Sequence, residues 1–149
     1  MDLWKSIRHK FQVAGQLSLR DWLGLAGAWW VLLGFFLALR RVSLDRLETF
    51  TRPTPIKMAD QPGAITWAWQ RQKWISMAAG LHLYPMTCLP RAISLRWMLS
   101  RHAIPSQLCI GITRNLEAMH AHAWVEVAGE PIGEAEDITE KFKVLQGTA

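Results

Sequence analysis

The sequence contains only two cysteines, Cys88 and Cys109, and it has little charge for its 149 residues. Two cysteines do not build a disulfide framework, and no small-residue cleavage site of a secretory signal peptide is found, so we expect a protein of the reducing cytoplasm. Charged residues make up 19% and hydrophobic residues 50% of the chain, unlike the composition of disordered proteins. One globular domain is therefore expected at this length.

Signatures of nucleic-acid binding are also absent, although the net charge is +5. The sequence has neither zinc-finger spacing nor the aromatic motif of RNA-binding sheets. The charge is unevenly distributed: residues 1–55 carry eight Lys or Arg against four Asp or Glu, whereas residues 125–149 carry two against six. The basic excess surrounds an apolar stretch, which favours contact with a membrane or a protein partner and not with nucleic acid.

The apolar stretch runs from Trp22 to Leu39 without a charged residue and is followed by Arg40 and Arg41. Eighteen apolar residues lie at the threshold for crossing a bilayer, where about 20 are usual. The alternative is a helix held between the domain and a partner or lipid surface. The composition predicts an apolar helical segment over 1–50 that docks or associates with a membrane, a proline-rich linker over 51–63, and a catalytic domain over 64–149.

The periodicity of the second half predicts an α+β fold in which a helix packs on a small antiparallel sheet. One helix is expected over 64–81, and a second begins near Pro90, a residue suited to a first helical turn. Alternating apolar residues predict strands over 106–113 and 120–127. A short third strand over 130–134 has a proline typical of an edge position.

Cys88 precedes the expected helix start by two residues, which would place its sulfur at the positive end of the helix. A helix N-terminus or a nearby imidazolium favours the nucleophilic thiolate form of cysteine, and backbone N–H groups there can form an oxyanion hole. Cys109 lies within a predicted strand and has the pattern of a small buried residue. Cys88 is therefore the candidate nucleophile.

A thiolate mechanism needs a general base and a third group that holds the base. His122 and His120 lie on the same face of one predicted strand, so position alone leaves both as candidates. Glu126 shares that face but lies about 13 Å along the strand from His122. Glu134 is expected to reach His122 only if the turn at 128–129 has an odd length or a bulge, because a two-residue loop would place it on the wrong face. Two further candidates for the acid are Glu136 and Asp137.

Two segments, CLPRAISLRWMLSRHAIPSQLCIGI and AHAWVEVAGEPIGE, resemble the transglutaminase-like leader peptidases of lasso-peptide biosynthesis. Members of that family typically have a Cys-Leu/Val-x-Arg helix start, a basic-Gly-Ile-Pro helix end and the string AHAWVEV. The resemblance covers roughly residues 64–145. It implies a transglutaminase-like or papain-like cysteine peptidase core with Cys88 as nucleophile, His122 as base and Glu134 as acid. The sequence departs from the family in two positions, with Glu134 where aspartate is usual and Ala103 where glycine is usual.

The resemblance also implies a reaction and its partners. The reaction is removal of the leader from a lasso-peptide precursor, before a separate synthetase closes the macrolactam. A small recognition-element protein is expected to deliver the leader, and residues 22–41 are expected to contact that protein, the synthetase or a membrane surface. The chemistry requires no metal or cofactor. Two alternatives stay open: acyl transfer to an amine through the same thioester, and an inactive, membrane-associated binding module.

Overall fold

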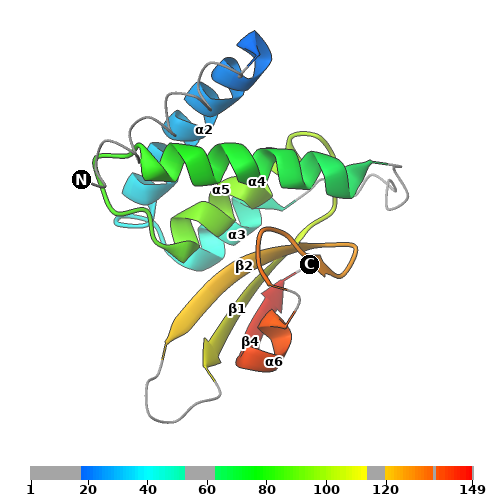
Figure 1. Cartoon of the computed structure of the whole chain (residues 1–149). Helices are drawn as coiled ribbons and strands as arrows, with labels where there is room; N and C mark the ends of the chain where they lie inside the picture. The colour runs from blue at the N-terminus through cyan, green and yellow to red at the C-terminus, as the bar shows by residue number, and fades with distance from the viewer. Residues whose placement is uncertain (1–17, 53–62, 114–119, 136, 149) are drawn as a thin grey trace, which may run out of the picture.

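A computed structural model describes residues 18–52, 63–113, 120–135 and 137–148 of the chain (Figure 1). Its helices are α2 (Leu19–Ala38), α3 (Leu44–Thr51), α4 (Ala64–Gly80), α5 (Cys88–Ser100) and α6 (Ile138–Lys141). Its strands are β1 (Gln107–Thr113), β2 (Ala121–Val127), β3 (Glu130–Pro131) and β4 (Phe142–Thr148). The described residues therefore form the predicted α+β fold, with an apolar helix preceding a helix-on-sheet core. Most of the predicted linker 51–63 lies outside the described residues.

α2 begins with a capping box that fixes its first turn. The Ser18 hydroxyl accepts a hydrogen bond from the backbone N–H of Asp21 at 3.2 Å, and the Asp21 carboxylate accepts one from the backbone N–H of Ser18. Hydrogen bonding by Ser18 holds the pKa of Asp21 below its ordinary value. Asp21 also accepts a bond from Nε1 of Trp74 at 3.3 Å, so the start of α2 is tied to α4.

The two predicted helices of the second half are confirmed, with one correction at the start of α5. The predicted helix over 64–81 is observed as α4. α5 begins at Cys88 itself and not near Pro90, because proline is tolerated throughout a first turn, where N–H groups lack partners inside the helix. Cys88 is thus the first residue of the helix, and Pro90 is the third.

The sheet has the strand order β3-β2-β1-β4 and is antiparallel throughout (Figure 1). The face that carries Ala123, Val125 and Val127 packs against the helices as part of the main hydrophobic core. On the opposite face, Cys109 of β1 and Trp124 of β2 form a second buried cluster with Ile138 of α6. Phe142 of β4 packs against this cluster. A Cβ at Gly111 would lie 3.1 Å from the Trp124 ring, so glycine lets this cluster close over β1. The middle of β2, from Ala123 to Val125, is therefore buried on both faces.

The turn between β2 and β3 lies at the residues that the sequence predicted. Val127 pairs with Glu130, so Ala128 and Gly129 form a two-residue turn, and both have the positive φ (52° and 82°) of a type I′ hairpin. The turn therefore has an even length, and the condition that strand alternation set for Glu134, an odd loop or a bulge at 128–129, is not met. β3 is an edge strand as predicted but is shorter, because regular pairing ends at Pro131. α3 lies almost entirely within the segment 1–50 that was expected to be helical, whereas α6 and β4 were not predicted.

The helices on both sides of the 51–63 segment share one hydrophobic core. Leu25, Leu32 and Phe35 of α2 and Leu47 of α3 are buried in the same cluster as residues of α4, α5 and the sheet. Glu48 of α3 and Arg96 of α5 are buried too; burial lowers the pKa of Arg96, and the nearby Glu48 opposes that shift. The division of the chain into 1–50, 51–63 and 64–149 stays a prediction, while α2 and α3 contribute to a common interior.

Candidate active site

Cys88 lies at the start of α5, where backbone N–H groups have no partners inside the helix. Thr87 occupies the N-cap position but makes no side-chain capping hydrogen bond, and Pro90 has no N–H to donate. No described residue accepts a hydrogen bond from the N–H of Cys88 or Leu89. These two groups point along the helix axis at its positive end, where they can stabilise negative charge.

A cavity of about 380 Å³ opens between α5, α4 and the sheet. From α5 it is lined by Cys88, Arg91, Ala92 and Leu95, which recur at the three- and four-residue spacing of one helix face. From β2 it is lined by His122 to Val125, and from the following loop by Ile132 and Glu134. The structure therefore brings the three predicted site residues together on one cavity, without a hydrogen bond between Cys88 and His122 among the described contacts.

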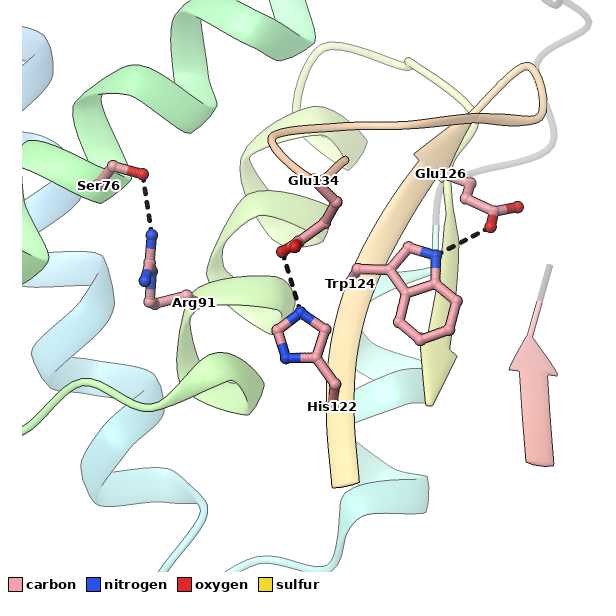
Figure 2. Close-up of polar contacts among 6 residues, drawn as sticks. All are labelled: Ser76, Arg91, His122, Trp124, Glu126 and Glu134. Carbon is pink, nitrogen blue, oxygen red and sulfur yellow. Dashed lines mark hydrogen bonds and ion pairs between the residues drawn. The ribbon is translucent and has the colours of Figure 1, made fainter. Parts of the chain in front are cut away.

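His122 is oriented by a carboxylate and by aromatic rings. Its Nε2 lies 3.1 Å from Oε1 of Glu134, and the two side chains are 26% and 27% exposed (Figure 2). The N–H is not aligned for a hydrogen bond, so the contact is an ion pair when the imidazole is protonated. The ring stacks near Trp124 at 6.1 Å and lies 5.3 Å from the ring of Phe142. Since Nε2 faces Glu134, Nδ1 is the nitrogen left to exchange a proton with another group.

Glu134 reaches His122 because the chain leaves the sheet at Gly133. The N–H of Ile132 still donates to the carbonyl of Val125 at 2.9 Å, as the register of β3 requires. Gly133 then adopts φ +79°, and a Cβ there would overlap the Gln72 side chain. Only glycine readily combines this backbone conformation with so close a contact. The strand alternation ends before Glu134, whose carboxylate turns back towards His122 in Figure 2.

The other candidate residues lie elsewhere. Asp137 forms an ion pair with Lys141 at 2.8 Å, and Glu126 accepts a hydrogen bond from Nε1 of Trp124 at 2.9 Å on the side away from Glu134 (Figure 2). His120 is exposed just before β2, and it does not line the cavity. Glu136 lies outside the described residues. Of the acids that the structure describes, Glu134 is thus the one placed against His122.

Cys109 has the surroundings of an inert thiol. It is 2% exposed in β1, and burial together with the Glu126 carboxylate, which also accepts its hydrogen bond, raises its pKa to about 12. The thiolate form is therefore scarce at neutral pH. Cys88, by contrast, is partly exposed and lines the cavity.

Arg91 and Gln72 line the cavity with polar side chains that were not assigned a role from the sequence. Arg91 follows Cys88 by three positions on the same helix face and donates a hydrogen bond to the Ser76 hydroxyl at 2.9 Å (Figure 2). Gln72 of α4 lines the same cavity. Helical spacing from Cys88 was a signal for Arg91, whereas nothing local points to Gln72. No three His, Cys, Asp or Glu side chains gather as metal ligands within the described part of the chain.

Residues 29–147 match the sequence model of the Transglutaminase-like superfamily, and the chain belongs to that superfamily. Among curated proteins it is similar to the microcin J25-processing protein McjB of Escherichia coli, with 28% identity over 71 residues. The matched part is 48% of this chain and 33% of that relative, so the similarity spans about a third of the relative's length. No solved structure gives a significant match.

Proposed function

We propose that this chain is a cytoplasmic cysteine peptidase that removes the leader from a lasso-peptide precursor before a partner synthetase forms the macrolactam. The observation that carries the proposal is the shared cavity. It is lined by Cys88 at the start of a helix and by His122, whose Nε2 faces Glu134. The similarity to a microcin-processing protein supports the substrate class. A leader-recognition protein is the proposed partner that delivers the precursor.

In the proposed reaction Nδ1 of His122 takes the proton from the Cys88 thiol, and the sulfur attacks the carbonyl carbon at the leader-core junction. The N–H groups of Cys88 and Leu89 are suited to hold the resulting oxyanion. As the C–N bond breaks, His122 returns the proton to the amine of the core peptide, and the leader stays as a thioester on Cys88. Water, deprotonated by His122, then attacks the thioester and releases the leader carboxylate.

The Glu134 carboxylate has two roles in this proposal. It holds the ring so that Nδ1, and not Nε2, serves the thiol, and it stabilises the imidazolium present after proton transfer. The 3.1 Å contact of the carboxylate with Nε2 supports both roles. The chemistry needs no metal, because the ionised sulfur is itself a strong nucleophile.

The proposal predicts that Cys88→Ala abolishes leader removal, because no other group on the cavity can form the thioester. Purified chain is incubated with a lasso-peptide precursor and a leader-recognition protein, and the products are followed by mass spectrometry. Cys109→Ala is the matched control, since its buried thiol takes no part, and it should cleave within about twofold of the wild type. Equal activity of the two variants would contradict the assignment.

The same experiment separates hydrolysis from its alternatives. Hydrolysis gives two peptides whose masses sum to the precursor plus one water, whereas acyl transfer gives a product that retains the leader joined to an amine.

Iodoacetamide should modify Cys88 in the folded Cys109→Ala variant and spare Cys109 in the folded Cys88→Ala variant, because only an accessible thiol reacts. A Cys88 as unreactive as Cys109 would favour an inactive binding module.

A further inference from the structure

The exposed face of α2 carries no charged side chain along most of its length. Leu23, Trp30 and Leu37 recur every seven residues and are 68%, 66% and 46% exposed. The whole segment from Trp22 to Leu39 is free of charge. By length and composition alone, α2 is long and apolar enough to cross a membrane. A helix face in water normally carries charged residues, so this face is expected to contact something less polar than water.

The loop after α4 enlarges this surface. Leu81, Leu83 and Tyr84 are 59%, 87% and 49% exposed. The loop lies along α2, because His82 stacks on Trp29 at 4.4 Å and Tyr84 stacks on Phe36 at 5.3 Å. We refer to six exposed residues from the helix and the loop as the apolar surface: Leu23, Trp30, Leu37, Leu81, Leu83 and Tyr84.

The charges at the C-terminal end of α2, where the helix meets the loop, are positive. Residues 22–41 and 81–87 contain no Asp or Glu, and Arg40 and Arg41 follow the C-cap residue Leu39 and are exposed, while Asp21 lies at the opposite end of the helix. The Arg40 guanidinium lies 4.6 Å above the ring of Phe36, beside Tyr84. An apolar surface with an arginine border complements the interface of a bilayer that contains anionic lipids, where arginines meet phosphates and aromatic rings lie among headgroups.

The opposite face of α2 is fixed in the protein, which determines how the helix can meet a membrane. Leu25, Leu32 and Phe35 are buried in the main core, and a Cβ at Gly24 would lie 2.6 Å from the Trp74 ring. A spanning orientation would remove these residues from α4 and α5 and expose the core. A helix with one face in the protein can instead lie flat in the interface and bury its other face among headgroups and upper acyl chains.

We propose that the apolar surface binds the headgroup region of an anionic lipid bilayer, with α2 parallel to the membrane plane. Binding of this kind does not require peptidase activity, so it stands apart from the function proposed above. The 81–87 segment leads directly into Thr87 and Cys88, both of which line the catalytic cavity. Membrane binding would therefore hold the start of α5 close to the lipid surface.

The test is flotation of the full chain with vesicles of phosphatidylcholine, alone or mixed with phosphatidylglycerol. We expect the chain to float with the mixed vesicles and to release in high salt. Trp30→Glu and Leu83→Glu should each weaken binding at least about tenfold, since each puts a charge where an apolar side chain enters the interface. Arg40→Gln should weaken binding to the mixed vesicles about fivefold and leave binding to pure phosphatidylcholine unchanged.

Leu145→Glu is the matched control, because Leu145 is 61% exposed on β4, away from the apolar surface. It should float as the wild type does, and all variants should retain the wild-type circular dichroism and cleavage activity in vesicle-free solution. Failure of the wild type to float, or equal loss of binding in the control, would overturn the proposal. If Trp30→Glu turned a dimer into a monomer without changing flotation, the surface would be a contact between copies and the proposal would also be wrong.

Discussion

The imidazole of His122 meets a carboxylate at one nitrogen and leaves the other towards the cavity that Cys88 lines. Its ring is bordered by Trp124 and Phe142, so the side chain has few other orientations available. Glu134 is one methylene longer than the aspartate usual in the related leader peptidases. The bend at Gly133 sets where that longer side chain starts, and its oxygen still comes within 3.1 Å of Nε2.

The role of Glu134 can be tested against that of Asp137. Glu134→Gln keeps the shape of the side chain and removes its charge, so the imidazolium formed during the reaction loses its stabilising partner. We expect kcat/KM for precursor cleavage to fall at least about tenfold. Asp137→Asn is the matched change and should stay within about twofold of the wild type, because that carboxylate pairs with Lys141. If Asp137→Asn lowered kcat/KM more than Glu134→Gln did, Asp137 and not Glu134 would be the acid of the triad.

At the scale of single residues, the local sequence was enough to single out Cys88, and the AHAWVEV string separated His122 from His120. Strand alternation alone gave the wrong condition for Glu134. The two-residue turn at Ala128 and Gly129 places residue 134 out of phase with His122, and the positive φ of Gly133 removes that constraint. No rule based on strand parity could include Gly133, because its conformation depends on contact with Gln72, 61 residues earlier.

At the scale of elements, the end of α5 has Ala103 where the family that the sequence resembles usually has glycine. This difference has a cost in backbone conformation. The N–H of Ile104 donates to the carbonyl of Leu99, and the N–H of Ala103 donates to that of Ser100, both at 3.1 Å. This is the Schellman arrangement, in which the residue between helix and strand adopts a left-handed conformation. Ala103 has φ +54°, a conformation that disfavours any residue with a Cβ.

Ala103→Gly should therefore raise the free energy of unfolding by about 1 kcal/mol. The gain arises because glycine adopts the left-handed conformation without a steric penalty. Urea unfolding followed by tryptophan fluorescence gives the free energy for each variant. Ala26→Gly, at an exposed position inside α2, is the control and should lower stability by about 0.5–1 kcal/mol, since its φ is helical. Equal destabilisation by both changes would mean that position 103 is not left-handed.

The elements near the active site were predictable because their periodicity is local. The spacing of apolar residues predicts α4, α5, β1 and β2. The start of α5 was predicted two residues late, because Pro90 is the third residue of the helix and not the first. β4 was missed because its sequence, with Lys143 and Gly147, does not alternate clearly. Its pairing with β1 is made across the whole of the chain between Thr113 and Phe142 and includes a register shift between Ile110 and Gly111.

At the scale of the whole molecule, the N-terminal helices contribute to the interior that supports the active site. Leu32 of α2 and Leu99 of α5 are both fully buried in the same cluster. The sequence predicted an apolar helix here but not which face it buries, because residues 22–39 are apolar all round and show no polar side. The buried face was set by packing against Trp74 and α5, which periodicity does not reveal.

Leu32→Ala should lower the free energy of unfolding by about 2–5 kcal/mol, as expected for a cavity in a packed core. Leu23→Ala, on the exposed face of the same helix, should change it by no more than about 0.5 kcal/mol. Thermal unfolding should show a single transition in both variants. A small effect of Leu32→Ala, or two separate transitions, would mean that the N-terminal helices unfold independently of the rest of the chain.

α5 contacts α2, α3, α4, β1 and β2, so it is the element that joins the layers of the molecule. The sulfur of the proposed nucleophile, Cys88, is carried on the first residue of this central helix and not on a loop. Controlling the reaction by displacing the sulfur would therefore require disturbing the entire interior. Control has to act instead on what enters the cavity, and compounds designed against this protein can treat the helix end as a fixed wall.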